Sequence, residues 1–311
     1  KIDALTDEKT VKIIAEKDKE LGSVPVMVKS KYCTTHIKNN LKGECNYDPG
    51  GYFIVGGQEK VIISIEKMVD NKVLVFTKKD PSYSNGLIYI TQINSRKYNW
   101  SDNLQIITIK NKKDGSLTVN MSQLSDVPLF VFLRALGMES DKEIISYITN
   151  NLEDLEMLNI LRNSVNSSVT QEGEEVKNKN DAIEFLVTKL RKHRRITQSD
   201  ADIALMQKKM FLRKVLSYDV LPHLGPDLKK KAIFICYMTK KLIEVQLGRR
   251  SPDDRDALQN KRVETPGVLL GQLFRQNLKK MLNEVGKQFR KKNNSDENPI
   301  NVINLINTTT I

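Results

Sequence analysis

The sequence predicts an α+β protein, with a mixed, β-rich N-terminal half followed by a helical C-terminal half. Short runs rich in Val, Ile and Thr, separated by Gly, Pro, Asn or Asp, dominate the chain as far as residue 121. From about residue 124 the apolar residues recur at the longer spacing of helices. With 311 residues, 39% of them hydrophobic and 28% charged, the chain is long enough for one large domain or two ordinary ones.

Seven short apolar runs are predicted as strands. They are residues 24–28, 52–55, 60–65, 72–76, 87–93, 104–110 and 117–121. Asp114 and Gly115 separate the last two runs, and an Asp-Gly pair between alternating runs is a strong signal for a β-hairpin.

The stretch GECNYDPGGYFIVGGQEK (43–60) contains two glycine pairs around four apolar residues. A phosphate-binding loop would end in Gly-Lys-Ser or Gly-Lys-Thr and open a helix, so that backbone amides meet the phosphate. Here a strand-like run follows instead. We therefore predict a tight turn at Pro49–Gly51, a buried strand at 52–55, and a chain reversal at Gly56 and Gly57.

Six segments are predicted as helices. They are residues 141–150, 152–163, 181–192, 199–218, 227–247 and 266–290. Asp181 and Ser199 are predicted N-caps, and Gly248 lies where a C-terminal cap belongs.

In the last helix the apolar residues recur at steps of three and four, which predicts one continuous apolar face. That face comprises Leu270, Leu273, Phe274, Leu278, Met281, Leu282, Val285 and Phe289. A single helix gains little stability unless such a face is buried, so we expect it to pack against residues 24–28, 52–55 or 60–65.

Two groups of residues have the composition of metal ligands. Cys33, His36 and Cys45 offer three ligands, whereas a structural zinc site needs four. The acids of SPDDRDALQNKR (251–262) alternate with bases, which favours ion pairs or a helix cap over magnesium binding. We predict no metal site, no cofactor and no catalytic residue in this segment, and a cap or core position for His223.

Cysteine usage and hydropathy indicate an intracellular protein. Three cysteines are too few and too scattered for a disulfide framework. No apolar run approaches the ~20 residues of a membrane span, and we expect no signal peptide. Because the chain opens inside sequence that already resembles a folded region, we expect it to be a fragment of something longer.

The net charge of +12 favours an anionic partner such as nucleic acid. Segment 189–195 holds five bases and no acid, and segment 261–292 holds nine bases against two acids, whereas 139–160 is acidic. This asymmetry suggests a DNA-facing side. The predicted DNA-binding residues are Lys189, Arg191, Lys192, Arg194, Arg195, Arg249, Arg250, Lys261, Arg262 and Arg275.

Four stretches carry a family resemblance in their order and separation. They are VPVMVKSKYC (24–33), LKGECNYDPGGYFIVGGQEKVIISIEKM (41–68), VPLFVFLRALGMESDKEII (127–145) and DDRDALQNKRVETPGVLLGQLFR (253–275). Together they resemble the second-largest, beta-type subunit of multisubunit DNA-directed RNA polymerases, in its eukaryotic, archaeal and large-DNA-virus branch. The sequence departs from that family's usual His at Ala257. Heavy use of Asn, Lys and Ile indicates an AT-rich genome, as in a large virus.

The resemblance implies a place inside a nucleotidyltransferase that is active in transcription. Residues 1–66 and 261–311 would form parts of the protrusion, with 67–260 inserted as the lobe. These parts would line the DNA cleft without performing catalysis, and Mg and Zn would be bound elsewhere in the full enzyme. The implied partners are DNA, the largest subunit, and initiation or elongation factors, with no membrane. The implied location is the nucleus of a eukaryotic cell, or the host cytoplasm or virion of a virus.

Two other functions are compatible with parts of the sequence. A free-standing basic nucleic-acid-binding module would account for the net charge without any polymerase. A phosphate-loop enzyme would account for the glycines, but the strand-like run after GGQEK disfavours it.

Overall fold

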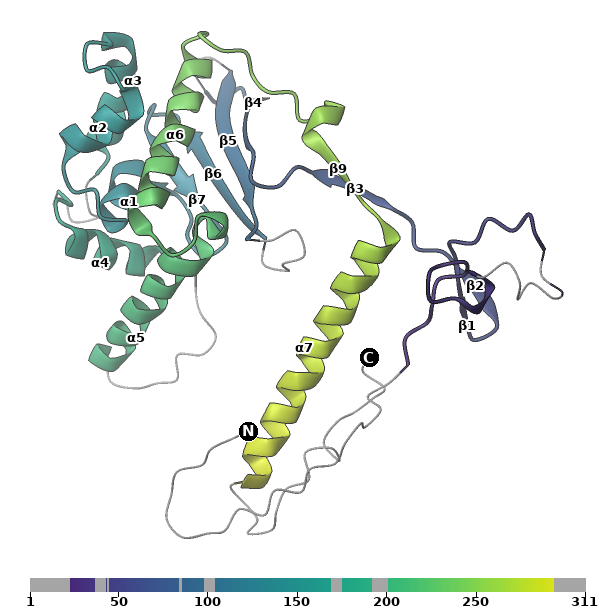
Figure 1. Ribbon diagram of the computed structural model, residues 1–311. Helices are drawn as coiled ribbons and strands as arrows, with labels where there is room; N and C mark the ends of the chain where they lie inside the picture. The colour runs from purple at the N-terminus through teal and green to yellow at the C-terminus, as the bar shows by residue number, and fades with distance from the viewer. Residues whose placement is uncertain are drawn as a thin grey trace. The chain divides into compact units, whose positions relative to one another are not determined.

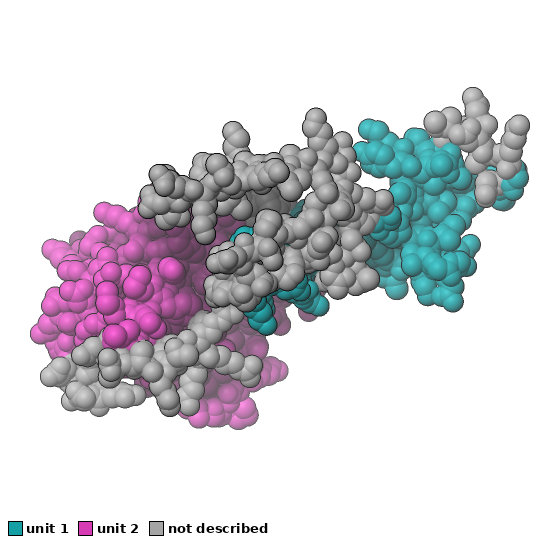
Figure 2. Space-filling model, turned by 90° about the horizontal axis from the view of Figure 1, so that it is seen from below, with its two compact units in different colours: residues 1–64, 265–311 teal, residues 65–264 magenta. Residues whose placement is uncertain are grey.

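The computed structural model describes residues 23–36, 43, 45–83, 86–97, 104–168, 175–191 and 201–293. The chain forms two compact units (Figure 2): residues 1–64 with 265–311 make unit 1, and residues 65–264 make unit 2. The predicted α+β class is confirmed, since most strands precede residue 121 and the longer helices follow it. The division at 1–66, 67–260 and 261–311 stays a prediction.

Unit 2 contains a five-stranded antiparallel sheet in which each strand pairs with the next along the chain (Figure 1). Its strands are β4 (Val73–Lys79), β5 (Leu87–Ser95), β6 (Gln105–Asn111), β7 (Leu117–Asn120) and β8 (Val127–Pro128). The register pairs Ile93 with Ile107 and Ile109 with Val119. All four side chains are buried, so these cross-strand pairs build the core face of the sheet.

The predicted hairpin between β6 and β7 is confirmed. Gly115 has a φ of +79°, which an L side chain rarely adopts, and its N–H donates to the carbonyl of Lys112 at 3.0 Å. The Asp114 carboxylate accepts from the Ser116 N–H at 2.8 Å, which closes the turn.

Helices cover the sheet of unit 2. They are α1 (Leu129–Ala135), α2 (Asp141–Thr149), α3 (Leu155–Asn166), α4 (Lys179–Lys189), α5 (Ala201–Lys214) and α6 (Leu228–Gln246), with a π-helical turn η3 (Val215–Asp219) and a 3-10 turn η4 (Pro222–Leu224). Helix α6 runs beside β4 and β5, and it also packs against α2 (Figure 1). The apolar residues that face inward from these elements form one continuous core.

Helix α1 was not among the predicted helices. All seven of its residues are buried. A helix that is surrounded by protein has no polar face, so its apolar residues show no helical period. The prediction of five helices between residues 141 and 247 is confirmed, with ends that shift by a few residues.

The predicted helix caps have mixed outcomes. Gly248 caps α6 with a φ of +73°, and the Arg249 N–H returns to the Glu244 carbonyl at 2.9 Å, as in a Schellman motif. The prediction for Asp181 was wrong: α4 begins two residues earlier, and Asp181 accepts from the backbone N–H of its N-cap, Asn178, at 3.4 Å. Ser199 lies outside the described residues.

The first and last strands of unit 2 pair with each other. Strand β3 (Ile65–Met68) lies antiparallel to β9 (Lys261–Glu264), which follows a 3-10 turn η5 (Leu258–Asn260). Ile65 is opposite Glu264, and Met68 is opposite Lys261. The chain therefore enters and leaves unit 2 through one two-stranded ribbon.

Unit 1 contains the glycine-bracketed hairpin. Strand β1 (Phe53–Val55) pairs with β2 (Gln58–Lys60), and the φ angles of Gly56 and Gly57 are +57° and +75°. The predicted reversal is thus confirmed. The predicted burial of the strand was wrong for Ile54 and Val55, which are exposed, although Phe53 is buried.

Two other strand predictions in the N-terminal part were wrong. Residues 24–28 form no strand; the Val28 N–H donates to the Tyr52 carbonyl, and the Val28 carbonyl accepts from the Gly51 N–H, but no ladder continues from these bonds. The run 60–65 is divided between the end of β2 and the start of β3, with 61–64 irregular.

Unit 1 also contains the long helix α7 (Pro266–Asn293), and a short 3-10 turn η1 (Thr34–His36). The predicted helix at 266–290 is confirmed. Its apolar face is unevenly covered, since Met281 is buried while Leu273, Phe274 and Leu282 are exposed. Packing of this face against residues 24–28, 52–55 or 60–65 stays a prediction.

Candidate nucleic-acid interface

The end of α4 carries the first predicted basic cluster. The Lys189 ammonium lies 5.7 Å from the centre of the Phe185 ring, and the Arg191 side chain is exposed. Leu190 forms a β-bridge with Leu124, and the Arg191 N–H donates to the Gln123 carbonyl at 3.1 Å. The chain therefore leaves α4 along the loop that follows β7. Lys192, Arg194 and Arg195 lie outside the described residues.

Arg249 is held by acids of α3. Its guanidinium forms two hydrogen bonds with the Asp154 carboxylate, one of them 2.9 Å long, and a third with Glu156 at 2.6 Å. Asp154 is also the N-cap of α3 and accepts from the Met157 N–H at 3.3 Å. The hydrogen bonds from Arg249 lower the pKa of Asp154, and those acids raise the pKa of Arg249. A phosphate that binds this side chain would compete with two carboxylates for its N–H donors.

The loop between α6 and β9 contains the predicted ion pairs. Arg250 pairs with Asp253 at 3.0 Å, and the other oxygen of Asp253 accepts from the Val75 N–H on β4 at 2.9 Å. The Asp254 carboxylate accepts from the Asp256 N–H at 2.8 Å. Arg255 lies over the Phe76 ring, 4.2 Å from its centre. These contacts fix the loop along the edge of the sheet.

The ribbon of β3 and β9 holds two further predicted residues. Lys261 pairs with Glu66 at 2.9 Å, and this hydrogen bond raises the pKa of Lys261. In a second pair across the ribbon the base lies on β3 and the acid on β9: Lys67 pairs with Glu264. Arg262 is exposed, and its guanidinium donates to the backbone carbonyls of Gln259 and Lys261 at 3.3 and 2.7 Å. In unit 1, Arg275 lies exposed on α7.

The predicted residues therefore do not gather into one free basic surface. Arg249, Arg250 and Lys261 form ion pairs within unit 2. Lys189, Arg191 and Arg262 remain accessible at separate positions of that unit, and Arg275 belongs to unit 1.

Two basic side chains, Lys231 and His223, are packed inside unit 2. Lys231 is fully buried, and its ammonium donates to the carbonyls of Leu216 and Ser217 in the π-helical turn. Burial lowers the pKa of Lys231 to about 8. Burial, and then the charge of Lys231, also lower the pKa of His223, whose Nδ1 lies 2.7 Å from the Ser95 hydroxyl. His223 is thus a partly buried packing residue, as predicted.

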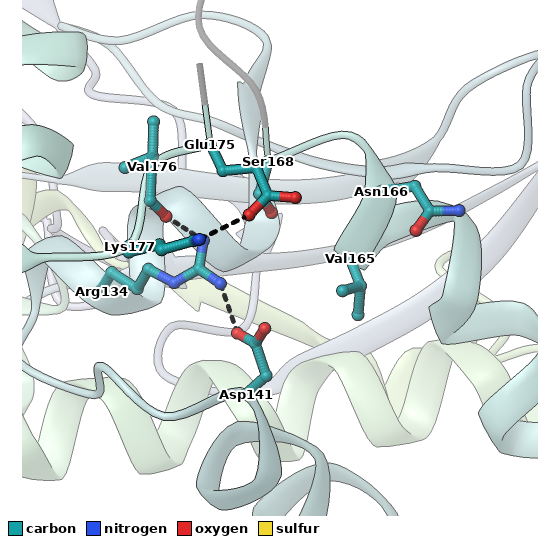
Figure 3. A pocket seen from close by; sticks show the side chains of 8 residues that line it. All are labelled: Arg134, Asp141, Val165, Asn166, Ser168, Glu175, Val176 and Lys177. Atoms are coloured by element: carbon teal, nitrogen blue, oxygen red, sulfur yellow. Dashed lines mark hydrogen bonds and ion pairs between the residues drawn. The ribbon is translucent and has the colours of Figure 1, made fainter. Parts of the chain in front are cut away.

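Sequence reasoning missed Arg134, the one charged residue in the apolar run LFVFLRA of α1. Its guanidinium donates to the Val176 carbonyl and to the Asp141 carboxylate (Figure 3). It lines a cavity of about 120 Å³ beside the Glu175–Lys177 ion pair, which is 3.0 Å long. Since two acids balance the two bases of this cavity, it lacks the excess positive charge of a phosphate site. The signal in the sequence that could have identified Arg134 is a single charged residue within an apolar run.

The candidate zinc ligands are engaged locally. The Cys33 thiol lies 3.0 Å from the Thr35 hydroxyl, a hydrogen bond that lowers the pKa of Cys33. His36 Nδ1 lies 3.4 Å from the Lys29 carbonyl. Across the described ranges, no three His, Cys, Asp or Glu side chains are grouped so as to hold a metal ion.

Most of unit 2, including the loop between α6 and β9, falls within a region that matches a known protein family. Residues 69–264 match the model for RNA polymerase Rpb2, domain 2. The chain belongs to this family. The Rpb2 match includes all predicted DNA-binding residues except Arg275, and it covers nearly all of unit 2.

Relatives of the Rpb2 family come from a virus, a eukaryote and an archaeon. The chain is 36% identical to DNA-directed RNA polymerase subunit 2 of Acanthamoeba polyphaga mimivirus, over 97% of this chain and 26% of the relative. It is 37% identical to DNA-directed RNA polymerase II subunit RPB2 of Encephalitozoon cuniculi, over 87% and 23%. It is 31% identical to DNA-directed RNA polymerase subunit Rpo2 of Saccharolobus solfataricus, over 87% and 23%.

These matches confirm the resemblance that the four sequence stretches indicated. The chain spans about a quarter of the length of these relatives. Among the described residues, no helix has both the length and the apolar character that a membrane crossing requires.

Proposed function

We propose that the chain is part of the second-largest subunit of a DNA-directed RNA polymerase, and that it lines the DNA cleft during DNA-templated RNA synthesis. The match of residues 69–264 to Rpb2 domain 2 carries this proposal. Support comes from relatives named as polymerase subunits in a virus, a eukaryote and an archaeon.

The role proposed for this segment is to bind and position, not to catalyse. Its net charge of +12 suits a surface that meets DNA phosphates. The proposed partners are DNA, the largest polymerase subunit, and initiation or elongation factors. Mg and Zn are proposed to be bound by parts of the enzyme outside this segment. The proposed location is the nucleus, or the host cytoplasm or virion if the source is a virus.

Purification through a tag on the polypeptide that contains residues 1–311 tests the proposal. Template-dependent RNA synthesis and the largest polymerase subunit should both co-purify with the tag. Recovery of a free basic protein with neither would refute the proposal in favour of a free-standing nucleic-acid-binding module.

The isolated 311-residue chain gives a second test. With template, magnesium and nucleoside triphosphates it should synthesise no RNA above a no-protein control. RNA synthesis by this segment alone would contradict the assigned role.

A further inference from the structure

Helix α7 has a basic face and an apolar face on opposite sides. At 3.6 residues per turn, six of the seven basic residues of the helix fall within about 160° of its circumference. They are Arg275, Lys279, Lys280, Lys287, Arg290 and Lys291. Most of the apolar residues, from Leu270 to Phe289, project from the other side. Glu284 is the single acid in the helix sequence, so the basic face carries a large positive excess.

The basic face is accessible. All six side chains are exposed. Arg275 and Lys291 make further contacts within the chain. Within the described ranges, Lys279, Lys280, Lys287 and Arg290 form no ion pair with an acid. We call these four residues the α7 basic face.

The basic residues near the C-terminal end of unit 2 have different surroundings from the α7 basic face. Arg249, Arg250 and Lys261 each contact a carboxylate within the chain. An anion that recruits one of them must first break an existing ion pair. Among the described residues the α7 basic face has no carboxylate partner to exchange, and its four side chains are exposed. A polyanion that binds such exposed cations releases counterions, which favours binding.

We propose that the α7 basic face binds the sugar-phosphate backbone of duplex DNA. This inference rests on the proposed function and names a surface that serves it. From Lys279 to Arg290 the helix rises about 16 Å, whereas duplex DNA presents one phosphate charge per about 1.7 Å of its axis. Several cations can therefore meet phosphates together. Lys side chains act as mobile point charges, so the contact carries no base sequence information.

Helices with a basic and an apolar face also bind anionic membranes, by inserting their apolar face among lipids. In α7 that face is already partly occupied. Met281 is 3% exposed, and Leu270, Leu278, Val285 and Phe289 are only partly exposed. Insertion into lipid would have to uncover these side chains, whereas phosphate binding by the opposite face leaves them in place. The arrangement therefore favours a nucleic acid.

A pair of charge-matched variants of the full 311-residue chain tests the proposal. The first carries Lys279→Gln, Lys280→Gln, Lys287→Gln and Arg290→Gln. The control carries Lys78→Gln, Lys79→Gln, Lys208→Gln and Lys229→Gln, four exposed positions of unit 2. Both variants have the same net charge. Gln is a good helix former, and circular dichroism checks that each variant keeps its helix content.

Fluorescence anisotropy with a labelled duplex of arbitrary sequence, over a series of salt concentrations, gives the affinity and its salt slope. The α7 variant should bind at least about tenfold more weakly at low salt, with a slope reduced by about 0.9 for each phosphate that the variant no longer neutralises. The control should keep most of the affinity and slope. A third variant, with Arg at Lys279, Lys280 and Lys287, should bind like the wild type, because it keeps the charge.

Other results overturn the inference. Equal reductions in affinity for the two neutralised variants would assign binding to net charge and leave the polymerase assignment intact. A wild-type chain that fails to bind duplex DNA would also reject this surface, while co-purification with RNA synthesis still decides the proposed function separately. Binding to anionic phospholipid vesicles that requires the α7 basic face, without binding to DNA, would reassign the helix to a membrane surface.

Discussion

The Arg249 guanidinium forms a bidentate ion pair with the carboxylate of Asp154. Arg249 lies just after the C-terminus of α6, and Asp154 is the N-cap of α3. The two residues are 95 positions apart in the sequence, and their pair connects the end of α6 to the start of α3. Arg249 thus has a structural partner, while the DNA contact expected of it from the sequence stays a prediction.

The first prediction concerns this pair. Arg249→Gln should raise the pKa of Asp154 toward its ordinary value and destabilise unit 2, because the N-cap carboxylate loses its main partner. Since the folded pKa is lowered, the stabilisation from Asp154 is present above its unfolded pKa and is lost as pH falls through the folded value. NMR titration and urea unfolding measure both effects. Binding to DNA should change no more than with Lys78→Gln; a larger change would restore Arg249 as a DNA contact.

A second prediction concerns Lys231 and the π-helical turn. Lys231→Met should destabilise the protein by about 1–3 kcal/mol, because the carbonyls of Leu216 and Ser217 lose a buried donor. Lys229→Met, at an exposed position two residues earlier, should stay within about 0.5 kcal/mol of the wild type. Urea unfolding compares the two. Equal effects would mean that the buried ammonium contributes nothing specific to the turn.

The same lysine predicts a pH dependence. Folding lowers its pKa from 10.5 to about 8, so its contribution to stability is fully favourable above the unfolded pKa and is lost as pH falls through about 8. The nearby carboxylates of Asp219 and Asp227 oppose this shift, while burial dominates it. The unfolding free energy of the wild type, minus that of Lys231→Met, should therefore increase between about pH 8 and 10.5. A difference that is flat over this range would contradict a depressed pKa.

Two glycines with similar backbone angles give a matched comparison. Gly115 has a φ of +79° and Gly248 a φ of +73°, so alanine at either position should cost about 1 kcal/mol of backbone strain. A Cβ at Gly115 would also lie 2.8 Å from Nδ2 of Asn163, which donates to the Asp114 carbonyl at 3.0 Å, whereas the space at Gly248 is open. Gly115→Ala should therefore cost about 1 kcal/mol more in thermal or urea unfolding. Equal costs would show that Asn163 moves freely.

The pairing of β3 with β9 predicts which chain boundaries give a stable, isolated unit 2. A chain of residues 65–264 should unfold cooperatively on its own, because it keeps the core and the paired ends. A chain of residues 67–260, which follows the boundaries expected from sequence, loses the Lys261–Glu66 and Lys67–Glu264 pairs and should be less stable. Calorimetry measures both. Equal melting temperatures would remove any stabilising role from the ribbon.

Local sequence signals predicted those parts of the fold that depend on near neighbours. Asp114-Gly115 and Gly56-Gly57 specify hairpins through their own backbone preferences, so both turns were placed correctly. Strands β4 to β7 of the sheet are short runs rich in Val, Ile and Thr between turn residues, and this composition was enough to predict them. Residues 24–28 have a strand-like composition, but no neighbouring strand extends the two bonds near Val28 into a ladder. Helix α1 lacks a period because protein surrounds it on every side.

The candidate site was harder to predict, because long-range contacts decide whether a cation is available. Neither the spacing nor the identity of residues near Arg249 indicates Asp154 as its partner. The alternation of acids and bases in 251–262 did predict local pairing, which Arg250 and Asp253 confirm. On α7 the charge pattern lies within one helix, so its two faces can be recognised from sequence alone.

Because Ile65 lies directly opposite Glu264, a folded unit 2 presents its first and last residues as neighbours, with Cα atoms about 5 Å apart. Once folded, the roughly two hundred residues of unit 2 therefore connect the two segments of unit 1 over a distance as small as that spanned by a short turn. As a flexible loop, the same segment would cost about 4 kcal/mol more closure entropy than a two-residue turn. Early folding of unit 2 removes that entropic barrier, so the order of events along the folding pathway sets how readily residues 23–64 and α7 can meet.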